Sequence, residues 1–166
     1  GIGMALSEEY VYDATGVQID RIHLVDHHAA PAASAFFCSP FDEATVITLD
    51  GVGEHDTATV WTGRGCSMRR LAGVRHPHSI GLLYSAFTAY LGFQVNEGEY
   101  KVMGMAAFGR PRHVDAVRAL IRQKGFRFTL DMRAFEFDDD RGLPYTQALV
   151  DTFGPPRPQE SRFDVS

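Results

Sequence analysis

Two adjacent histidines, His27 and His28, follow an apolar segment that ends in Val-Asp. Imidazole and carboxylate groups together bind iron, manganese or zinc, and a second ligand is expected four residues later on the same helical face. Here Pro31 stands four residues after His27. Because proline is tolerated in the first turn of a helix, two interpretations stay open: an incomplete metal site, or hydrogen-bonded histidines at a helix start.

A second group of candidate residues lies in the segment "TLDGVGEHDTAT", residues 48–59. Asp50 ends an apolar strand and is followed by Gly51, Gly53 and Glu54. Glycines in such a turn allow backbone N–H groups to approach a phosphate, while the carboxylate of Asp50 is free to hold a cation. The same pattern is also typical of an ordinary hairpin turn, so both interpretations remain.

The third candidate segment is "NEGEYKVMGMAAFG", residues 96–109. Glu99 and Lys101 flank the start of a predicted helix that contains Gly104. A helix N-terminus and a lysine together favour an anion. A solvated capping turn is the alternative.

The hydrophobic pattern predicts the elements that position these residues. Short runs rich in β-branched residues predict strands at 19–26, 44–51, 55–65, 66–74 and 126–137. Helical spacing and breaker residues predict helices at 32–41, 79–93 with Ser79 as N-cap, 100–109, 112–125 ending at Gly125, and 144–153. Strands that alternate with helices predict an α/β fold, in which polar residues at strand ends form ligand sites.

Composition limits the class of protein. The 166 residues, with 45% hydrophobic and 22% charged, fit one globular domain or a piece of a larger one. A net charge of -5 without a Lys/Arg run argues against nucleic acid as a partner. No apolar run approaches the roughly 20 residues that span a bilayer, so we expect a cytoplasmic protein without a membrane partner. Cys38 and Cys66 lack a CxxC pattern and are expected to be reduced thiols.

The residue patterns at both ends of the chain indicate truncation within a domain. The final segment, 153–166, is turn-rich and then resumes with Phe163 and Val165 as if another element were starting. The sequence therefore predicts a domain truncated at both ends. Open sheet edges and uncovered helix faces would then favour aggregation or a homodimer.

Three segments in this order resemble one protein family: "VDHHAAPAASAFFCSPFDEATVITLDGVGE", "SIGLLYSAFTAYLGF" and "GEYKVMGMAAFGRP". They are similar to the carbamoyltransferases of the nodulation-protein and cephalosporin type, which attach a carbamoyl group to a hydroxyl of an antibiotic or nodulation factor. The resemblance covers most of residues 20–111 and continues more weakly through 153–166.

The resemblance implies a fold, a reaction and partners. It implies part of an actin-like ATPase domain, a mixed sheet with flanking helices as in sugar kinases and heat-shock chaperones. The implied cofactors are ATP, carbamoyl phosphate as substrate, and a divalent metal, typically Fe²⁺; a carbamoyl-adenylate is the intermediate. A separate C-terminal YrdC-like domain makes that adenylate and is absent from residues 1–166. The implied partners are this remainder of the polypeptide and a small-molecule hydroxyl acceptor.

The resemblance also implies roles for individual residues. His27 and Asp50 would be metal ligands; the family's histidine at position 31 is replaced by Pro31, which should weaken metal binding. Lys101 would supply positive charge in catalysis, and His28 would orient a ligand or bind substrate. The implied cofactor-binding residues are Gly51, Gly53, Glu54, Glu99 and Gly104.

Two other functions are compatible with these residues. One is a degenerate, non-catalytic member of the superfamily that binds a nucleotide or a partner, as Pro31 suggests. The other is a different actin-like ATPase such as a sugar-kinase relative. The segments "DHH", "LDGVGE" and "GEYKVMG" argue against the kinase, because kinases of that fold need no histidine metal site.

Overall fold

The computed structural model describes residues 25–138, 142–159 and 161. Its helices are α2 (Ala29–Phe37), α3 (Ile80–Tyr90), α4 (Glu99–Ala106), α5 (Val114–Ala119) and α6 (Gln147–Phe153). Its strands are β1 (Glu43–Gly53), β2 (Asp56–Arg64), β3 (Ser67–Arg75), β4 (Ile121–Lys124) and β5 (Arg127–Leu130). The strand predicted at 19–26 falls outside the described residues except for Val25 and Asp26, which are in no strand.

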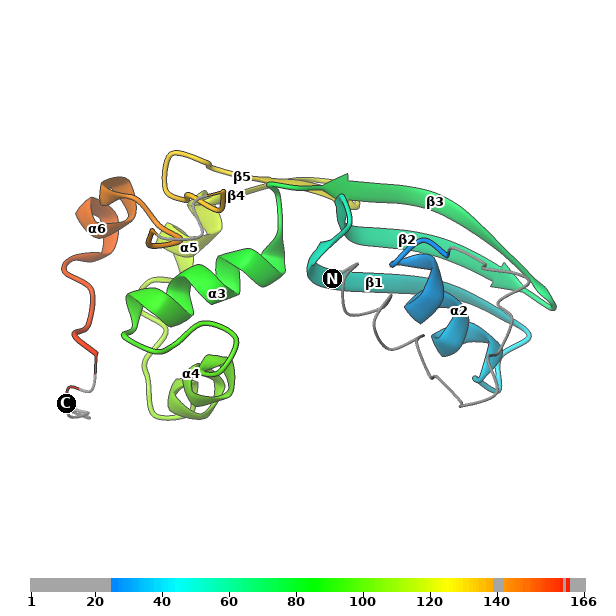
Figure 1. The fold of residues 1–166 in the computed structure, drawn as a ribbon, viewed down its shortest axis with the longest axis horizontal. Coiled ribbons are helices and arrows are strands. Elements are labelled where there is room, and N and C mark those ends of the chain that lie inside the picture. Colours follow the sequence, from blue (N-terminus) through cyan, green and yellow to red (C-terminus); the bar gives the residue numbers. More distant parts are fainter. Residues whose placement is uncertain (1–24, 139–141, 160, 162–166) are drawn as a thin grey trace, which may run out of the picture.

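The strands β1, β2 and β3 form an antiparallel sheet in sequence order. This confirms the strands predicted at 44–51 and 55–65 and the return strand that follows them. Helix α2 covers one face of this sheet (Figure 1). There Phe36 packs so closely on Gly63 that a Cβ at this glycine would lie 2.6 Å from the ring. On the opposite face Ile47 and Leu49 are exposed.

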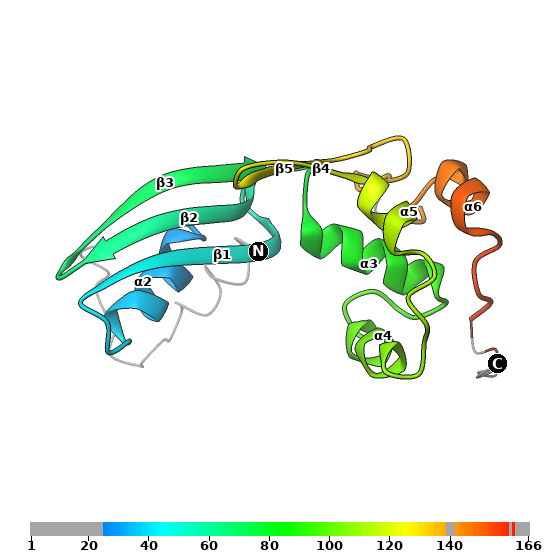
Figure 2. The same ribbon diagram turned by 180° about the vertical axis from the view of Figure 1, so that it is seen from behind.

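A second region, built from α3 to α6 and the β4–β5 hairpin, lies beyond one end of the sheet (Figures 1 and 2). Ser79 caps α3 as predicted, since its Oγ accepts the N–H of Leu82 at 3.0 Å. The core of this region consists of Leu83, Ala86, Tyr90, Leu120, Leu130, Ala134, Phe135, Tyr145 and Leu149. Tyr90 lies at its centre and meets the ring of Tyr145 edge-on, with 5.6 Å between centroids.

The helix predicted at 112–125 is confirmed only over 114–119, and its end at Gly125 is wrong. Helix α5 ends at Ala119, and the next residues form β4, which pairs antiparallel with β5. Gly125 does not cap a helix; it occupies the first position of the two-residue hairpin loop with φ +60. A glycine at that position suits a tight hairpin, and pairing with β5 overrides the helical pattern.

The strand predicted at 126–137 is shorter than expected. It stops at Leu130 because Asp131 begins a turn in which its carboxylate accepts the N–H of Arg133 at 3.2 Å. All strand pairings among the described residues are antiparallel, so the mixed sheet that the resemblance implied is not seen within them. The architecture is an α/β arrangement of antiparallel sheets with flanking helices. No helix in the described part is long and apolar enough to cross a bilayer.

Candidate functional site

The first site residues that the fold brings together are His27 and Asp50. His27 Nε2 lies 2.6 Å from Asp50 Oδ2, and the two side chains are 46% and 43% exposed. One side chain comes from the residue before the cap of α2 and the other from β1. Although partial burial alone would raise the pKa of the Asp50 carboxyl, hydrogen bonds from His27 and from the Gly51 N–H hold it below its usual value. We call these two residues the His27–Asp50 pair.

The start of α2 positions His27. Two residues before the N-cap His28, the Asp26 side chain binds the helix start: its Oδ1 accepts the N–H of Ala29 at 3.0 Å. Hydrogen bonds of the helical i to i−4 type run from the N–H of Ala30 to the carbonyl of Asp26 and from the N–H of Ala32 to the carbonyl of His28. Pro31 lies between them in the first turn of α2, where its missing N–H costs a single hydrogen bond at the helix start. The helix tolerates proline here, as the sequence predicted.

The N-terminus of α3 positions Asp50 from the other side. Ser79 Oγ donates to the carbonyl of Asp50 at 3.1 Å. Gly81 approaches this turn so closely that a Cβ there would lie 2.8 Å from the Asp50 carbonyl oxygen and from the Gly51 nitrogen. The positive end of the α3 dipole therefore faces the β1 turn and favours negative charge there.

Gly53 lies directly against both histidines. A Cβ at this position would come within 2.3 Å of His27 Cδ2 and 3.0 Å of His28 Nε2. A side chain at residue 53 would therefore displace the imidazoles. Gly51 has more room, because a Cβ there would meet only Leu82, at 3.8 Å. Gly53 thus makes space for the histidines, a steric role that the sequence did not indicate.

His28 differs sharply from its neighbour. It is 1% exposed, and both ring nitrogens have protein partners: Thr48 Oγ1 lies 2.7 Å from Nδ1, and the carbonyl of Asp56 lies 2.9 Å from Nε2. This is the hydrogen-bonded histidine at a helix start that the sequence left open. A role for His28 in catalysis would have to pass through its neighbours.

Glu54 lies on the far side of the β1–β2 turn. It occupies the first position of the two-residue loop with φ +58, a conformation that is uncommon for a residue other than glycine. Together with His55, Arg75 and His76 it lines a shallow hollow of about 370 Å³. The lining of this hollow is polar and charged, and it includes neither His27 nor Asp50.

Glu99, Lys101 and Gly104 lie on α4, which packs on α3 rather than on β1 (Figure 1). Partial burial raises the pKa of the Glu99 carboxyl, but hydrogen bonds from Asn96, Ser85 and its own turn outweigh this and lower it. The Lys101 ammonium lies 5.9 Å from the ring centroid of Phe93. Open space surrounds Gly104. The structure does not bring these three residues to the His27–Asp50 pair.

The His27–Asp50 pair has the donor atoms of a metal site. Metal–nitrogen and metal–oxygen bonds are about 2.1 Å, so two such ligands on one ion lie about 3.0 to 3.4 Å apart. The observed distance of 2.6 Å between His27 Nε2 and Asp50 Oδ2 would have to lengthen by about 0.4 to 0.8 Å. Within the part of the chain that the structure describes, no third histidine, cysteine or carboxylate joins them. The pair fits a divalent ion with two protein ligands.

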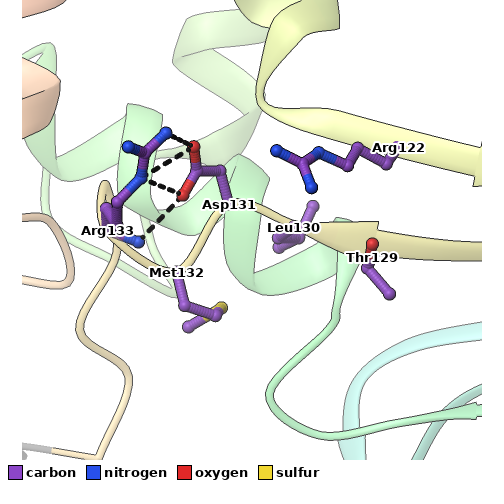
Figure 3. Close-up of a pocket in the computed structure, with 6 residues that line it drawn as sticks. All are labelled: Arg122, Thr129, Leu130, Asp131, Met132 and Arg133. Atoms are coloured by element: carbon purple, nitrogen blue, oxygen red, sulfur yellow. Dashed lines mark hydrogen bonds and ion pairs between the residues drawn. The ribbon is translucent and has the colours of Figure 1, made fainter.

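A larger recess was missed by the sequence analysis. It has a volume of about 590 Å³ and lies at the open end of the β4–β5 hairpin, where β4 begins and β5 ends (Figure 3). Asp131 and Arg133 lie on its rim and bind each other, with Arg133 Nη2 at 2.6 Å from Asp131 Oδ2. Arg122 points toward the same recess from β4. Because the first strand of the hairpin was predicted as the end of a helix, no sequence pattern placed these residues together.

Comparison with known proteins adds a family. The sequence matches the family described as "Carbamoyltransferase N-terminus" over residues 5–160. It is 47% identical over 135 residues to the uncharacterized protein sll1178 of Synechocystis, covering 80% of this chain and 22% of that protein. It is 35% identical over 156 residues to nodulation protein NolNO of Sinorhizobium fredii, covering 88% and 22%. Nodulation protein NolO of Bradyrhizobium diazoefficiens is 32% identical over 137 residues, covering 74% and 24%. The chain thus spans less than a quarter of the length of these relatives.

Proposed function

This chain belongs to the carbamoyltransferase N-terminus family, and we propose that it forms part of the catalytic domain of an O-carbamoyltransferase. The proposed reaction moves a carbamoyl group from carbamoyl phosphate, activated with ATP, to a hydroxyl of a small molecule. The proposed domain is of the actin-like ATPase type. The observation that carries the proposal is the His27–Asp50 pair, in which an imidazole and a carboxylate from two separate elements meet at 2.6 Å.

We propose that His27 and Asp50 hold a divalent ion, Fe²⁺ being the expected one. Such an ion would neutralise charge on the phosphate oxygens of the activated carbamoyl group. Nitrogen and carboxylate oxygen are suitable donors for iron. The lowered pKa of Asp50 keeps its carboxylate deprotonated, which a metal ligand requires.

The chain's own backbone supports an anion beside this pair. Helix α3 begins against the Asp50–Gly51 turn, and its first N–H groups, those of Ile80 and Gly81, precede the first intrahelical hydrogen bond. Such N–H groups and the helix dipole favour phosphate. The positive charge proposed for Lys101 has less support, because its ammonium lies over the rings of Phe93 and Tyr100.

The test uses the full-length protein with ATP, Fe²⁺ and radiolabelled carbamoyl phosphate. Transfer of label is measured to a panel of hydroxyl-bearing oligosaccharides and antibiotic scaffolds, and pyrophosphate release is followed in parallel. We expect Asp50→Asn to reduce transfer by about 100-fold or more, with carbamoyl-phosphate-dependent pyrophosphate release retained. Asp115→Asn is the matched control, because the Asp115 side chain is 99% exposed on α5.

Two outcomes would contradict the proposal. If wild-type protein binds ATP but transfers no label to any acceptor and releases no pyrophosphate, the chain is part of a nucleotide-binding protein without turnover. If Asp50→Asn transfers label as fast as wild type, the pair has no part in the reaction. We also expect the 166-residue chain by itself to show no transfer. Turnover by this purified piece would show that the remainder of the polypeptide is not required.

A further inference from the structure

A continuous chain of hydrogen bonds runs through the interior of the sheet region behind the His27–Asp50 pair. Trp61 Nε1 donates to Thr59 Oγ1 at 2.6 Å. Thr59 Oγ1 lies 2.5 Å from Thr48 Oγ1, which lies 2.7 Å from His28 Nδ1. His28 Nε2 then lies 2.9 Å from the carbonyl oxygen of Asp56. We call these five groups the hydrogen-bond chain.

The direction of every bond in the hydrogen-bond chain follows from its two ends. An indole N–H can only donate, and a backbone carbonyl can only accept. His28 therefore donates from Nε2 to the Asp56 carbonyl, and in the neutral imidazole it accepts at Nδ1 from the hydroxyl of Thr48. Thr48 in turn accepts from Thr59, which accepts from Trp61. Each hydroxyl accepts one hydrogen bond and donates one, so no member can reverse without leaving another unpaired.

Burial makes this arrangement rigid. His28 is 1% exposed and Thr59 is fully buried, so water cannot replace a lost partner. The far end is also fixed, because the Asp56 carboxylate accepts from the Arg70 guanidinium of β3 at 2.8 and 2.9 Å. The hydrogen-bond chain thus joins the start of α2 to β1 and β2, and through Asp56 to β3.

The hydrogen-bond chain reaches both members of the His27–Asp50 pair. Thr48 lies two residues before Asp50 on β1. The ring of His28 meets the ring of His27 edge-on, with 5.4 Å between centroids, and Gly53 packs against both. A shift of His28 would therefore move His27 relative to the strand that carries Asp50.

We propose that Thr48 and Thr59 are positioning residues, which act through His28 to set the geometry of the His27–Asp50 pair and hence its affinity for a divalent cation. This inference rests on the metal-binding part of the proposed function. It assigns a role to two threonines that touch neither metal nor substrate. It also explains why the second histidine of the "DHH" segment is buried.

The test compares two buried threonines of β2 whose hydroxyls contact different groups. Thr57 is as buried as Thr59, but its hydroxyl donates to the carbonyls of His78 and Val74, away from His28. We expect Thr59→Val and Thr48→Val to weaken Fe²⁺ binding about 10-fold in the full-length protein, measured by anaerobic calorimetry with the metal alone. Thr57→Val should lower the Tm to a similar extent and change Fe²⁺ affinity less than about twofold.

Rescue and spectroscopy separate positioning from general damage. Thr59→Ser keeps the hydroxyl, so its Fe²⁺ affinity should return to that of wild type. Trp61 is the chain's single tryptophan, so its fluorescence should change in Thr59→Val, which removes its hydrogen-bond acceptor, and not in Thr57→Val. If Thr59→Val does not fold, Trp61→Phe removes the indole donor to Thr59 with both hydroxyls in place and should also weaken Fe²⁺ binding.

The outcomes distinguish this inference from the proposed function. If wild type binds Fe²⁺ and both Thr59→Val and Trp61→Phe bind it equally well, the positioning role is wrong while the metal site stands. Equal weakening by Thr57→Val and Thr59→Val would also overturn it, because the effect would then be general. If wild type binds no Fe²⁺, the metal-binding part of the proposed function fails first, and the positioning role falls with it.

Discussion

The interior beneath α2 and the interior around α3 are built from different chemistry. Beneath α2 the apolar cluster is small, and Thr48, Thr59 and His28 share the buried space with it. Around α3 the interior is aliphatic and aromatic, and the Tyr90 hydroxyl binds a backbone carbonyl at its edge. Hydrogen bonds are directional and apolar contacts are not. The first interior therefore fixes positions, and the second contributes most of the buried apolar area.

The aromatic interior still satisfies its polar groups at its boundary. Burial, together with the neighbouring Tyr145, raises the pKa of the Tyr90 phenol, which donates to the carbonyl of Gly154 at 2.7 Å. This bond ties α3 to the segment that follows α6. In the aromatic interior a polar group thus makes its hydrogen bond at the edge of the core, whereas beneath α2 the polar groups lie inside it. The following changes test this division of roles, beginning with the largest expected effect.

Leu149→Ala should be the most destabilising of these changes. Leu149 is fully buried in the core around α3, and removing its side chain leaves a cavity that costs about 2–5 kcal/mol of unfolding free energy. Denaturant unfolding measures this loss. Fe²⁺ affinity of the folded variant should be unchanged, since the His27–Asp50 pair lies in the other region. A fall in affinity would show that the two interiors are not separate in function.

Gly81→Ala should affect both regions at once. The new Cβ would lie 2.8 Å from backbone atoms of Asp50 and Gly51, so α3 and the β1 turn must move apart. Overpacking of this kind costs about 1–3 kcal/mol. Both the Tm and Fe²⁺ affinity should fall. Gly104→Ala is the stability control, because open space surrounds that glycine and alanine is the better helix former. Unchanged affinity in Gly81→Ala would mean that α3 does not position Asp50.

Pro31→His should sharpen the site without changing either core. Residues i and i+4 of a helix share a face, so the new imidazole can add a third ligand beside His27. We expect about 10-fold tighter Fe²⁺ binding, or about 1.4 kcal/mol. Ala33→His points to another face of α2 and should have no such effect. If metal binding and carbamoyl transfer appear only in Pro31→His, the natural protein is a binding module or relic rather than an enzyme.

The smallest effect is expected at Asp131, on the surface of the β4–β5 region. Hydrogen bonds from Arg133 lower the pKa of its carboxyl from 3.8 to about 2. A pKa that is lower in the folded state stabilises the protein above about pH 4, and this contribution is lost as the pH falls toward 2. Asp131→Asn should therefore flatten the fall in Tm between pH 4 and pH 2. An unaltered pH profile would mean that the ion pair is not maintained in solution.

The sequence predicted best where a local pattern decides the structure. The paired strands after Asp42, the cap at Ser79 and the tolerance of α2 for Pro31 all follow from local patterns, and the structure confirms them. The prediction failed for the segment after Leu120, because Ile121 continues the helical spacing of Val117 and Leu120. Only pairing with Arg127–Leu130, a contact between segments, makes it a strand.

The site was predictable by residue type but not by role. His27 and Asp50 were expected to act together, and the fold does place them in contact, although their metal-binding role stays a prediction. Two neighbouring histidines are equivalent in sequence, so only the entry of the chain into α2 determines that His28 turns inward. Thr48 is polar at a buried strand position, two residues after the buried Val46 on the same face of β1. That misplaced polarity was the signal for a buried hydrogen-bond partner.

Helix α4, which carries Lys101, is held in place with little buried surface. No residue of α4 is buried, and the side-chain contacts that hold its first turn centre on Glu99. We expect a helix with so little buried surface to open locally before the whole protein unfolds, so that its amides exchange with solvent early. Ordering α4 costs conformational entropy, and the free energy of binding a ligand would have to offset that cost. If α4 takes part in the proposed binding, a bound ligand should slow that exchange.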